Sequence, residues 1–220
     1  MSGFFQTHKA TLDKALNASR TREYFSPYPE VASGKIYGES ARDDGQKAFQ
    51  ALLGKEYVID GHPGDGQSIG LEKSPYGIEL NVKYQNPTPP QLIAAAQAAE
   101  KDWAKATIEE RVGVCLEILH RLNARSFEMA HAVSHTTGQA FMMAFQAGGP
   151  HAQDRGLEAL AYAYAEMTRT PAKAIWTKPQ GKHDPLVLEK IYRVVPRGLA
   201  LVIGCATFPT WNSYPGLFAS

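Results

Sequence analysis

Apolar residues recur at helical spacing over most of residues 1–168, which predicts a series of amphipathic helices. Thr107-x-x-Glu110 is typical of a capping box at the start of one helix, and Gly138 has the position of a helix-ending residue. The stripe after this box comprises Val112, Cys115, Leu116, Leu119 and Leu122. The predicted helices cover 1–22, 47–53, 90–103, 107–122, 126–138, 140–147 and 151–168.

The pattern changes after residue 185, where apolar residues become continuous. Leu186 to Val195 predicts an entry strand, and Leu199 to Ile203 is an unbroken apolar run bounded by Gly198 and Gly204. A run this short predicts a strand that is buried on both faces inside a parallel sheet. Ligands of such sheets bind beyond the carboxyl ends of the strands, so the turn after Ile203 is the expected site of chemistry.

Two other segments predict loops. Residues 23–38 mix aromatic residues with proline and favour an extended path over an apolar surface. Residues 60–70 contain four glycines, which suit either a phosphate cradle or a loop. The loop is favoured, because the segment lacks the lysine and the following helix of a P-loop.

Composition excludes several classes of protein. The formal net charge of the 220 residues is +1, and basic residues form no block, so we expect no nucleic-acid partner and no membrane surface. Two distant cysteines, Cys115 and Cys205, suit a reducing cytoplasm. We expect no secretory signal and no membrane span, since no apolar run is long enough for either.

Four polar blocks together resemble the aldehyde dehydrogenase superfamily, and among its branches the phenylacetic acid degradation protein PaaN type. The blocks are Ser-Pro-Tyr-Pro-Glu at 26–30, His-Thr-Thr-Gly-Gln at 135–139, Gly-Gly-Pro-His-Ala-Gln-Asp-Arg at 148–155 and Thr-Phe-Pro-Thr-Trp-Asn at 207–212. The resemblance implies an α/β fold with a helical cover and the first strands of a Rossmann-like cofactor domain. It implies a family-specific extension at 1–80 and an incomplete NAD(P)-binding domain at 81–220.

The resemblance implies an oxyanion donor, which in the family is an Asn after the first strand. Counting without gaps from Gly198 places Thr207 at that position, whereas Asn212 needs a gap of five residues. Thr207 is favoured by alignment, and Asn212 stays the chemical alternative because its amide is the family's usual donor. Both residue types also satisfy backbone groups in ordinary turns.

The resemblance also places NAD or NADP against the backbone of Ile203, Gly204, Cys205 and Ala206. Gly204 would allow close approach of the cofactor, or else would merely permit a tight turn. No Gly-x-Gly-x-x-Gly fingerprint follows the strand, so the cofactor rests on the resemblance.

Neither cysteine is assigned as the nucleophile. Cys115 lies on an apolar helix stripe and is expected to be inert, and Cys205 has a cofactor-contacting position by resemblance. The family's nucleophilic Cys and general-base Glu lie downstream of residue 220. We therefore expect a truncated portion of the enzyme that is inactive alone.

Glu128, His131 and His135 share one helix face and are candidate metal ligands with His151. We favour histidines that pack and hydrogen-bond, and assign no metal. Gly148 to Arg155 is expected to begin a helix, with a possible part in a substrate channel.

The expected function is NAD(P)-dependent oxidation of an aldehyde or semialdehyde in phenylacetic (aromatic) acid degradation, in a cytoplasmic homo-oligomer. The alternative is a non-catalytic helical interaction domain or a pseudoenzyme remnant. Placement of Leu199 to Ile203 in a helix, or on the exposed periphery of a closed helical body, would argue against the dehydrogenase.

Overall fold

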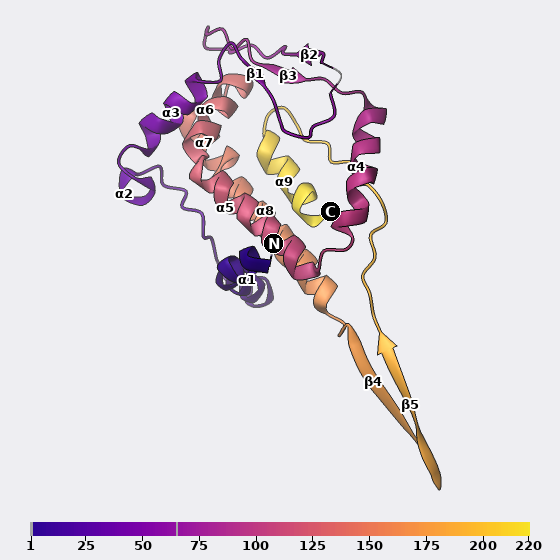
Figure 1. The fold of residues 1–220 in the computed structure, drawn as a ribbon. Coiled ribbons are helices and arrows are strands. Elements are labelled where there is room, and N and C mark those ends of the chain that lie inside the picture. Colours follow the sequence, from indigo (N-terminus) through magenta and orange to yellow (C-terminus); the bar gives the residue numbers. More distant parts are fainter. Residues whose placement is uncertain (1, 65) are drawn as a thin grey trace.

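The computed structural model describes residues 2–64 and 66–220. Helices make up most of these residues, and they lie around a compact centre from which one hairpin projects (Figure 1). The helices are α1 (Ser2–Thr21), α2 (Gly34–Tyr37), α3 (Ala41–Gln50), α4 (Pro89–Trp103), α5 (Ile108–Ala124), α6 (Ser126–Thr137), α7 (Phe141–Gly148), α8 (Pro150–Thr168) and α9 (Pro209–Ala219). None of them combines the length and apolar character that crossing a bilayer requires, over the residues described.

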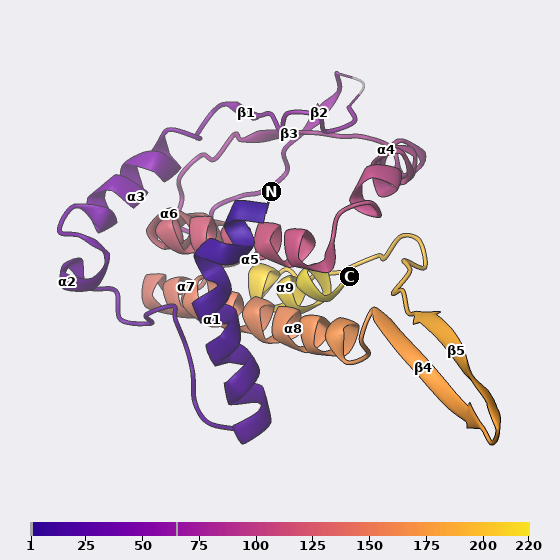
Figure 2. The ribbon, with the colours of Figure 1, turned by 60° about the horizontal axis from the view of Figure 1, so that its bottom comes forward.

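Helices α1, α5, α8 and α9 bury their apolar stripes against one another and form the larger core. Leu12 of α1 and Leu119 of α5 are fully buried there, with Tyr214 and Phe218 of α9. Helices α8 and α9 approach closely at Gly156, where a Cβ would lie 2.8 Å from the ring of Phe218. This core therefore joins the first helix of the chain to the last (Figure 2).

A smaller core lies between α3, α6 and α7. Phe127 and Phe145 are buried in it with ring centroids 4.8 Å apart, and Tyr37 meets both rings edge to face. The Tyr37 hydroxyl donates to the carbonyl of Pro29 at 2.5 Å. Tyr37 thus fixes the extended segment before it to this second core.

Two small sheets flank the helices. Strand β3 (Lys83–Gln85) pairs in parallel with β1 (Glu56–Tyr57) and antiparallel with β2 (Ser68–Ile69). Strands β4 (Lys173–Gln180) and β5 (His183–Ile191) form an antiparallel hairpin that extends away from the helices in both views (Figures 1 and 2). All residues of this hairpin are exposed, including Ile175 at 68%.

The prediction of a buried strand at Leu199 to Ile203 is wrong for this structure. The segment is exposed, with Leu201 at 85% and Ile203 at 81%, and no strand pairs with it among the described residues. A parallel strand needs neighbours on both edges to satisfy its N–H and C=O groups, and β4 and β5 pair only with each other.

The segment nevertheless keeps a strand-like alternation. A Cβ on Gly216 of α9 would lie 3.0 Å from Val202, and a Cβ on Gly204 would lie 2.2 Å from the Ser213 hydroxyl. Val202 and Gly204 thus face α9, whereas the alternate residues Leu201 and Ile203 face solvent. The helix expected after this segment is present as α9, and Val202 and Gly204 lie against it.

The helix predictions are confirmed in kind, with differences at the ends. Thr107 and Glu110 form the predicted capping box, with bonds of 3.1 and 3.0 Å. Gly138 ends α6 with φ of 81°. The helix predicted at 47–53 is α3, which starts at Ala41 and ends at Gln50. Its first half is helical as well, and Gly45 is buried there against Phe127.

Candidate functional site

The site begins in the exposed turn that leads from Ile203 into α9. Ile203, Gly204, Cys205 and Ala206 are all exposed, and no backbone hydrogen bond joins these four residues to another part of the described chain. Gly204 is needed for close approach, since the place of a Cβ is taken by Ser213. The unpaired N–H and C=O groups of this turn are free to bind a polar ligand.

Three donors gather around the sulfur of Cys205. The amide of Asn212 donates to Sγ at 2.8 Å, the backbone N–H of Phe208 donates at 3.3 Å, and the Thr207 hydroxyl lies 3.3 Å away. These bonds, from Thr207 first and then Phe208 and Asn212, lower the pKa of the Cys205 thiol to about 7. A large fraction of this exposed thiol is therefore ionised at neutral pH.

Thr207 and Asn212, the two candidates for the oxyanion donor, thus lie at one place. The structure does not separate them by distance, since both side chains contact Cys205. They differ in capacity, because an amide nitrogen carries two hydrogens and a hydroxyl carries one. Asn212 can donate to the sulfur and to a second acceptor at the same time.

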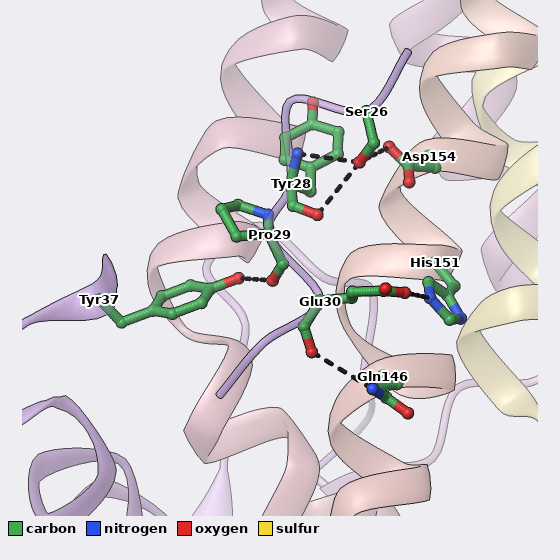
Figure 3. Close-up of polar contacts among 8 residues, drawn as sticks. All are labelled: Ser26, Tyr28, Pro29, Glu30, Tyr37, Gln146, His151 and Asp154. Atoms are coloured by element: carbon green, nitrogen blue, oxygen red, sulfur yellow. Dashed lines mark hydrogen bonds and ion pairs between the residues drawn. The ribbon is translucent and has the colours of Figure 1, made fainter. Parts of the chain in front are cut away.

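The four blocks that carry the resemblance come together in space. Ser26 Oγ lies 3.0 Å from Asp154 Oδ1, and Glu30 Oε2 lies 2.7 Å from His151 Nε2, so the first block lies on the third (Figure 3). Gln139 of the second block donates its side-chain amide to the carbonyl of Thr207 in the fourth. The four blocks are therefore parts of one contiguous region of the structure.

A cavity of about 250 Å³ lies where the first, third and fourth blocks meet. Aromatic side chains form much of its wall, and the charged groups Glu30, His151, Asp154 and Arg155 complete it. Burial raises the pKa of Asp154 to about 6, while the bond from Ser26 opposes that shift. The aromatic residues are Tyr24, Tyr28 and Trp211.

The structure resembles a solved enzyme over almost its whole length. The crystal structure of an NAD-dependent aldehyde dehydrogenase from Burkholderia multivorans matches 98% of this chain at 56% sequence identity, with a TM-score of 0.95. This chain has the fold of the amino-terminal part of an aldehyde dehydrogenase. It spans 38% of the length of that neighbour. No protein-family model matches the chain, and no curated protein does.

This likeness changes the meaning of the exposed segment at Leu199 to Ile203. Exposure of this segment on a closed helical body was expected to argue against a dehydrogenase. The helical body is not closed, because the hairpin β4–β5 extends away from it and Leu201 and Ile203 are exposed beside it (Figure 2). The exposure of Leu199 to Ile203 therefore does not conflict with the match to the amino-terminal part of an aldehyde dehydrogenase.

The candidate metal ligands Glu128, His131 and His135 pack instead against neighbouring side chains. The rings of His131 and His135 stack on Phe49 at 5.8 and 5.0 Å, and His135 Nδ1 lies 2.9 Å from the Ser74 hydroxyl. Glu128 accepts two bonds from Arg125. Over residues 2–64 and 66–220, no group of three metal-binding side chains has a suitable arrangement.

Cys115 is partly buried on the stripe of α5, and burial raises the pKa of its thiol. Sequence reasoning missed the bond between Asn212 and Cys205, which depends on how the segment at 199–206 lies against α9. It also missed Gln139, Ser26 and Asp154 as links between blocks, because contacts over more than 60 residues leave no local signal.

Proposed function

We propose that this chain is part of an enzyme that oxidises an aldehyde with a nicotinamide cofactor. The observation that supports this most is the match to an NAD-dependent aldehyde dehydrogenase at 56% identity over 98% of the chain. The exposed turn at 203–206, which follows the apolar segment at Leu199 to Ile203 and precedes α9, is the second support.

In this proposal the cofactor lies against the backbone of Ile203, Gly204, Cys205 and Ala206. The fit rests on the exposed and unpaired backbone groups of that turn. The cofactor supplies a hydride acceptor when it is bound. NAD is preferred because the neighbour is NAD-dependent, and NADP remains the alternative.

Thr207 and Asn212 stabilise the oxygen that becomes negative when the aldehyde carbon is attacked. Asn212 has a second amide hydrogen available beyond its bond to Cys205, whereas Thr207 is favoured by the ungapped alignment. In this proposal the 220 residues supply neither the nucleophilic Cys nor the general-base Glu, and we propose that they do not oxidise an aldehyde on their own. Residues 1–80 form the family-specific extension and 81–220 the beginning of the cofactor domain.

The substrate is an aromatic aldehyde or semialdehyde from phenylacetic acid degradation. The support is the cavity beside the fourth block, where Tyr24, Tyr28 and Trp211 offer ring faces and edges to an aromatic group. Trp211 is four residues from Thr207, so their Cα atoms are at most about 14 Å apart. The extended segment at 24–30 thus contributes to substrate choice.

The enzyme is proposed to be a cytoplasmic homo-oligomer. The support for assembly is the hairpin β4–β5, since an isolated two-stranded hairpin is marginal in water and this one exposes Ile175, Val187 and Ile191 on its surface. The same exposed surface is what a non-catalytic interaction domain would use, which keeps that function as the second candidate.

The test compares residues 1–220 with a version extended downstream, using NAD⁺ or NADP⁺ and matched aromatic and aliphatic aldehydes. Reduction of the cofactor by the extended protein only is the expected result. Within the extended protein, Thr207→Val and Asn212→Leu identify the oxyanion donor, since loss of one donor lowers kcat about 10²–10³-fold. Thr210→Val is the control, because Thr210 bonds only to the carbonyl of Gly148. Turnover by residues 1–220 alone, or its absence from the extended protein, would contradict the proposal.

A further inference from the structure

A second cavity lies away from the aldehyde site, between the sheet β1–β3 and helices α3, α5 and α6. Its volume is about 290 Å³, close to the lower limit of small-molecule sites. Residues of β1, β3 and the three helices line it, and none of its lining residues lines the cavity at Tyr24. Its apolar wall includes Phe49, Leu52, Leu80, Val82, Leu122 and Met129.

The polar groups of this cavity are few and distinct. Arg125 is held by Glu128 through two bonds of 2.7 and 2.6 Å, so its charge is compensated. The rings of Tyr57 and Tyr84 belong to the wall, with centroids 6.4 Å apart.

Glu72 is the group that the cavity leaves without a counter-charge. Its carboxylate accepts the backbone N–H of Leu71 at 3.2 Å, and no cation lies within ion-pair distance among the described residues. Glu72 and Tyr84 line the same cavity, and burial first, then the Glu72 charge, raise the pKa of Tyr84. The lining residues carry one positive and two negative charges, so the cavity as a whole is complementary to a single positive charge.

We propose that this cavity binds a small organic cation with an apolar, single-ring body, of the arylalkylammonium class. The apolar wall takes the ring, and the ammonium group lies between Glu72 and the faces of Tyr57 and Tyr84. An anion of the same shape is disfavoured, because the guanidinium of Arg125 is already occupied by Glu128 and Glu72 would repel it. This inference does not depend on the aldehyde oxidation, since the two cavities share no residue.

Three probes of one shape and different charge test the proposal in the purified protein. They are 2-phenylethylamine, 2-phenylethanol and phenylacetate, each titrated calorimetrically at neutral pH and low salt. The amine is expected to bind about 5-fold more tightly than the alcohol, and the alcohol more tightly than the acid.

Two variants locate the site. Glu72→Gln is expected to remove the advantage of the amine while leaving the alcohol within about 2-fold. Glu79→Gln is the matched control, because Glu79 is exposed, belongs to the same segment and does not line the cavity. Ala132→Phe fills the cavity and is expected to abolish binding of all three probes, with a melting curve to verify that the variant is folded.

Equal affinity for amine and alcohol, or tighter binding of phenylacetate, would overturn the proposed ligand class. Unchanged affinity for the amine in Glu72→Gln would show that Glu72 is not the partner. Absence of detectable binding by all three probes at millimolar concentration would remove the site. If Ala132→Phe does not fold, the two glutamate variants locate the site. Loss of the tighter binding of the amine relative to the alcohol in Glu72→Gln, but not in Glu79→Gln, supports the proposal.

Discussion

Two regions of the molecule contain similar apolar side chains that differ in burial. They are the helical body, made by α1, α5, α8 and α9, and the arm, residues 173–203. In the body Leu12 and Leu119 are wholly buried, whereas in the arm Ile175 and Leu201 are 68% and 85% exposed. The difference is in the neighbours, since each body helix packs against at least two other helices, whereas the two strands of the hairpin pair only with each other. An apolar segment therefore predicts that a surface can be buried, but whether it is buried depends on packing partners outside that segment.

The largest expected effect comes from one leucine in each region. Leu119→Ala leaves a cavity in the body and should lower the free energy of unfolding by about 2–5 kcal/mol. Leu188→Ala removes a side chain that is 44% exposed in the arm and should change it by no more than about 0.5 kcal/mol. Urea unfolding of both variants measures the difference, and equal losses would show that the arm is buried in solution by a partner or a second copy.

Asp154 tests whether the extended segment at 24–30 belongs to the body. Its folded pKa of about 6 is above its ordinary value, so the stability it contributes is full below about pH 4 and is lost as the pH rises through 6. Asp154→Asn removes this dependence and should stabilise the protein at pH 7.5 by about 1–2 kcal/mol, after discounting for partial exposure. Melting temperatures from pH 4 to pH 8 measure it. A variant whose pH dependence equals that of the wild type would show that Asp154 is solvated and that the segment is not part of the body.

The capping box tests a local contribution within the body. Thr107→Ala removes the side-chain acceptor for the N–H of Glu110 at the start of α5 and should cost about 1 kcal/mol. Thr136→Ala is the control, since its hydroxyl only bonds back to its own helix. A loss equal to that of the control would mean that tertiary packing alone fixes the start of α5.

The turn between arm and body gives the smallest effect on stability, and a distinct effect on reactivity. In a Cys115→Ser background, Asn212→Leu removes one donor from the Cys205 sulfur, so the midpoint of alkylation by iodoacetamide should move to higher pH. Thr210→Val should leave the midpoint in place, because Thr210 does not contact the sulfur. An unmoved midpoint in Asn212→Leu would mean that the arm's end is not held by α9.

Most of the helices could be predicted because each carries its own signal. The Thr107 box, the glycine at 138 and the stripe from Val112 to Leu122 are local features, and the structure has all of them. The helix α9 after the segment at Leu199 to Ile203 could be predicted as well. The strand predicted at that segment is absent, because a strand needs pairing partners that the sequence of Leu199 to Ile203 does not contain.

The site was predicted in part. The residues of the turn were named, but their mutual contacts follow from the angle between the segment at 199–203 and α9, which no spacing reveals. The links between Ser26 and Asp154, and between Gln139 and Thr207, depend on how distant helices pack. They are visible in the sequence only as polar residues with no evident local role.

The open edges of Leu199 to Ile203 have a practical consequence for handling the protein. Five consecutive apolar residues without charge or proline form a template on which an identical chain can add as a strand. Pro196 and Arg197 act as gatekeepers on one side, whereas Gly204 and Cys205 on the other offer no repulsion. Concentrated samples are therefore expected to self-associate through this segment, and an aspartate in place of Leu201 is the substitution that would keep them dispersed.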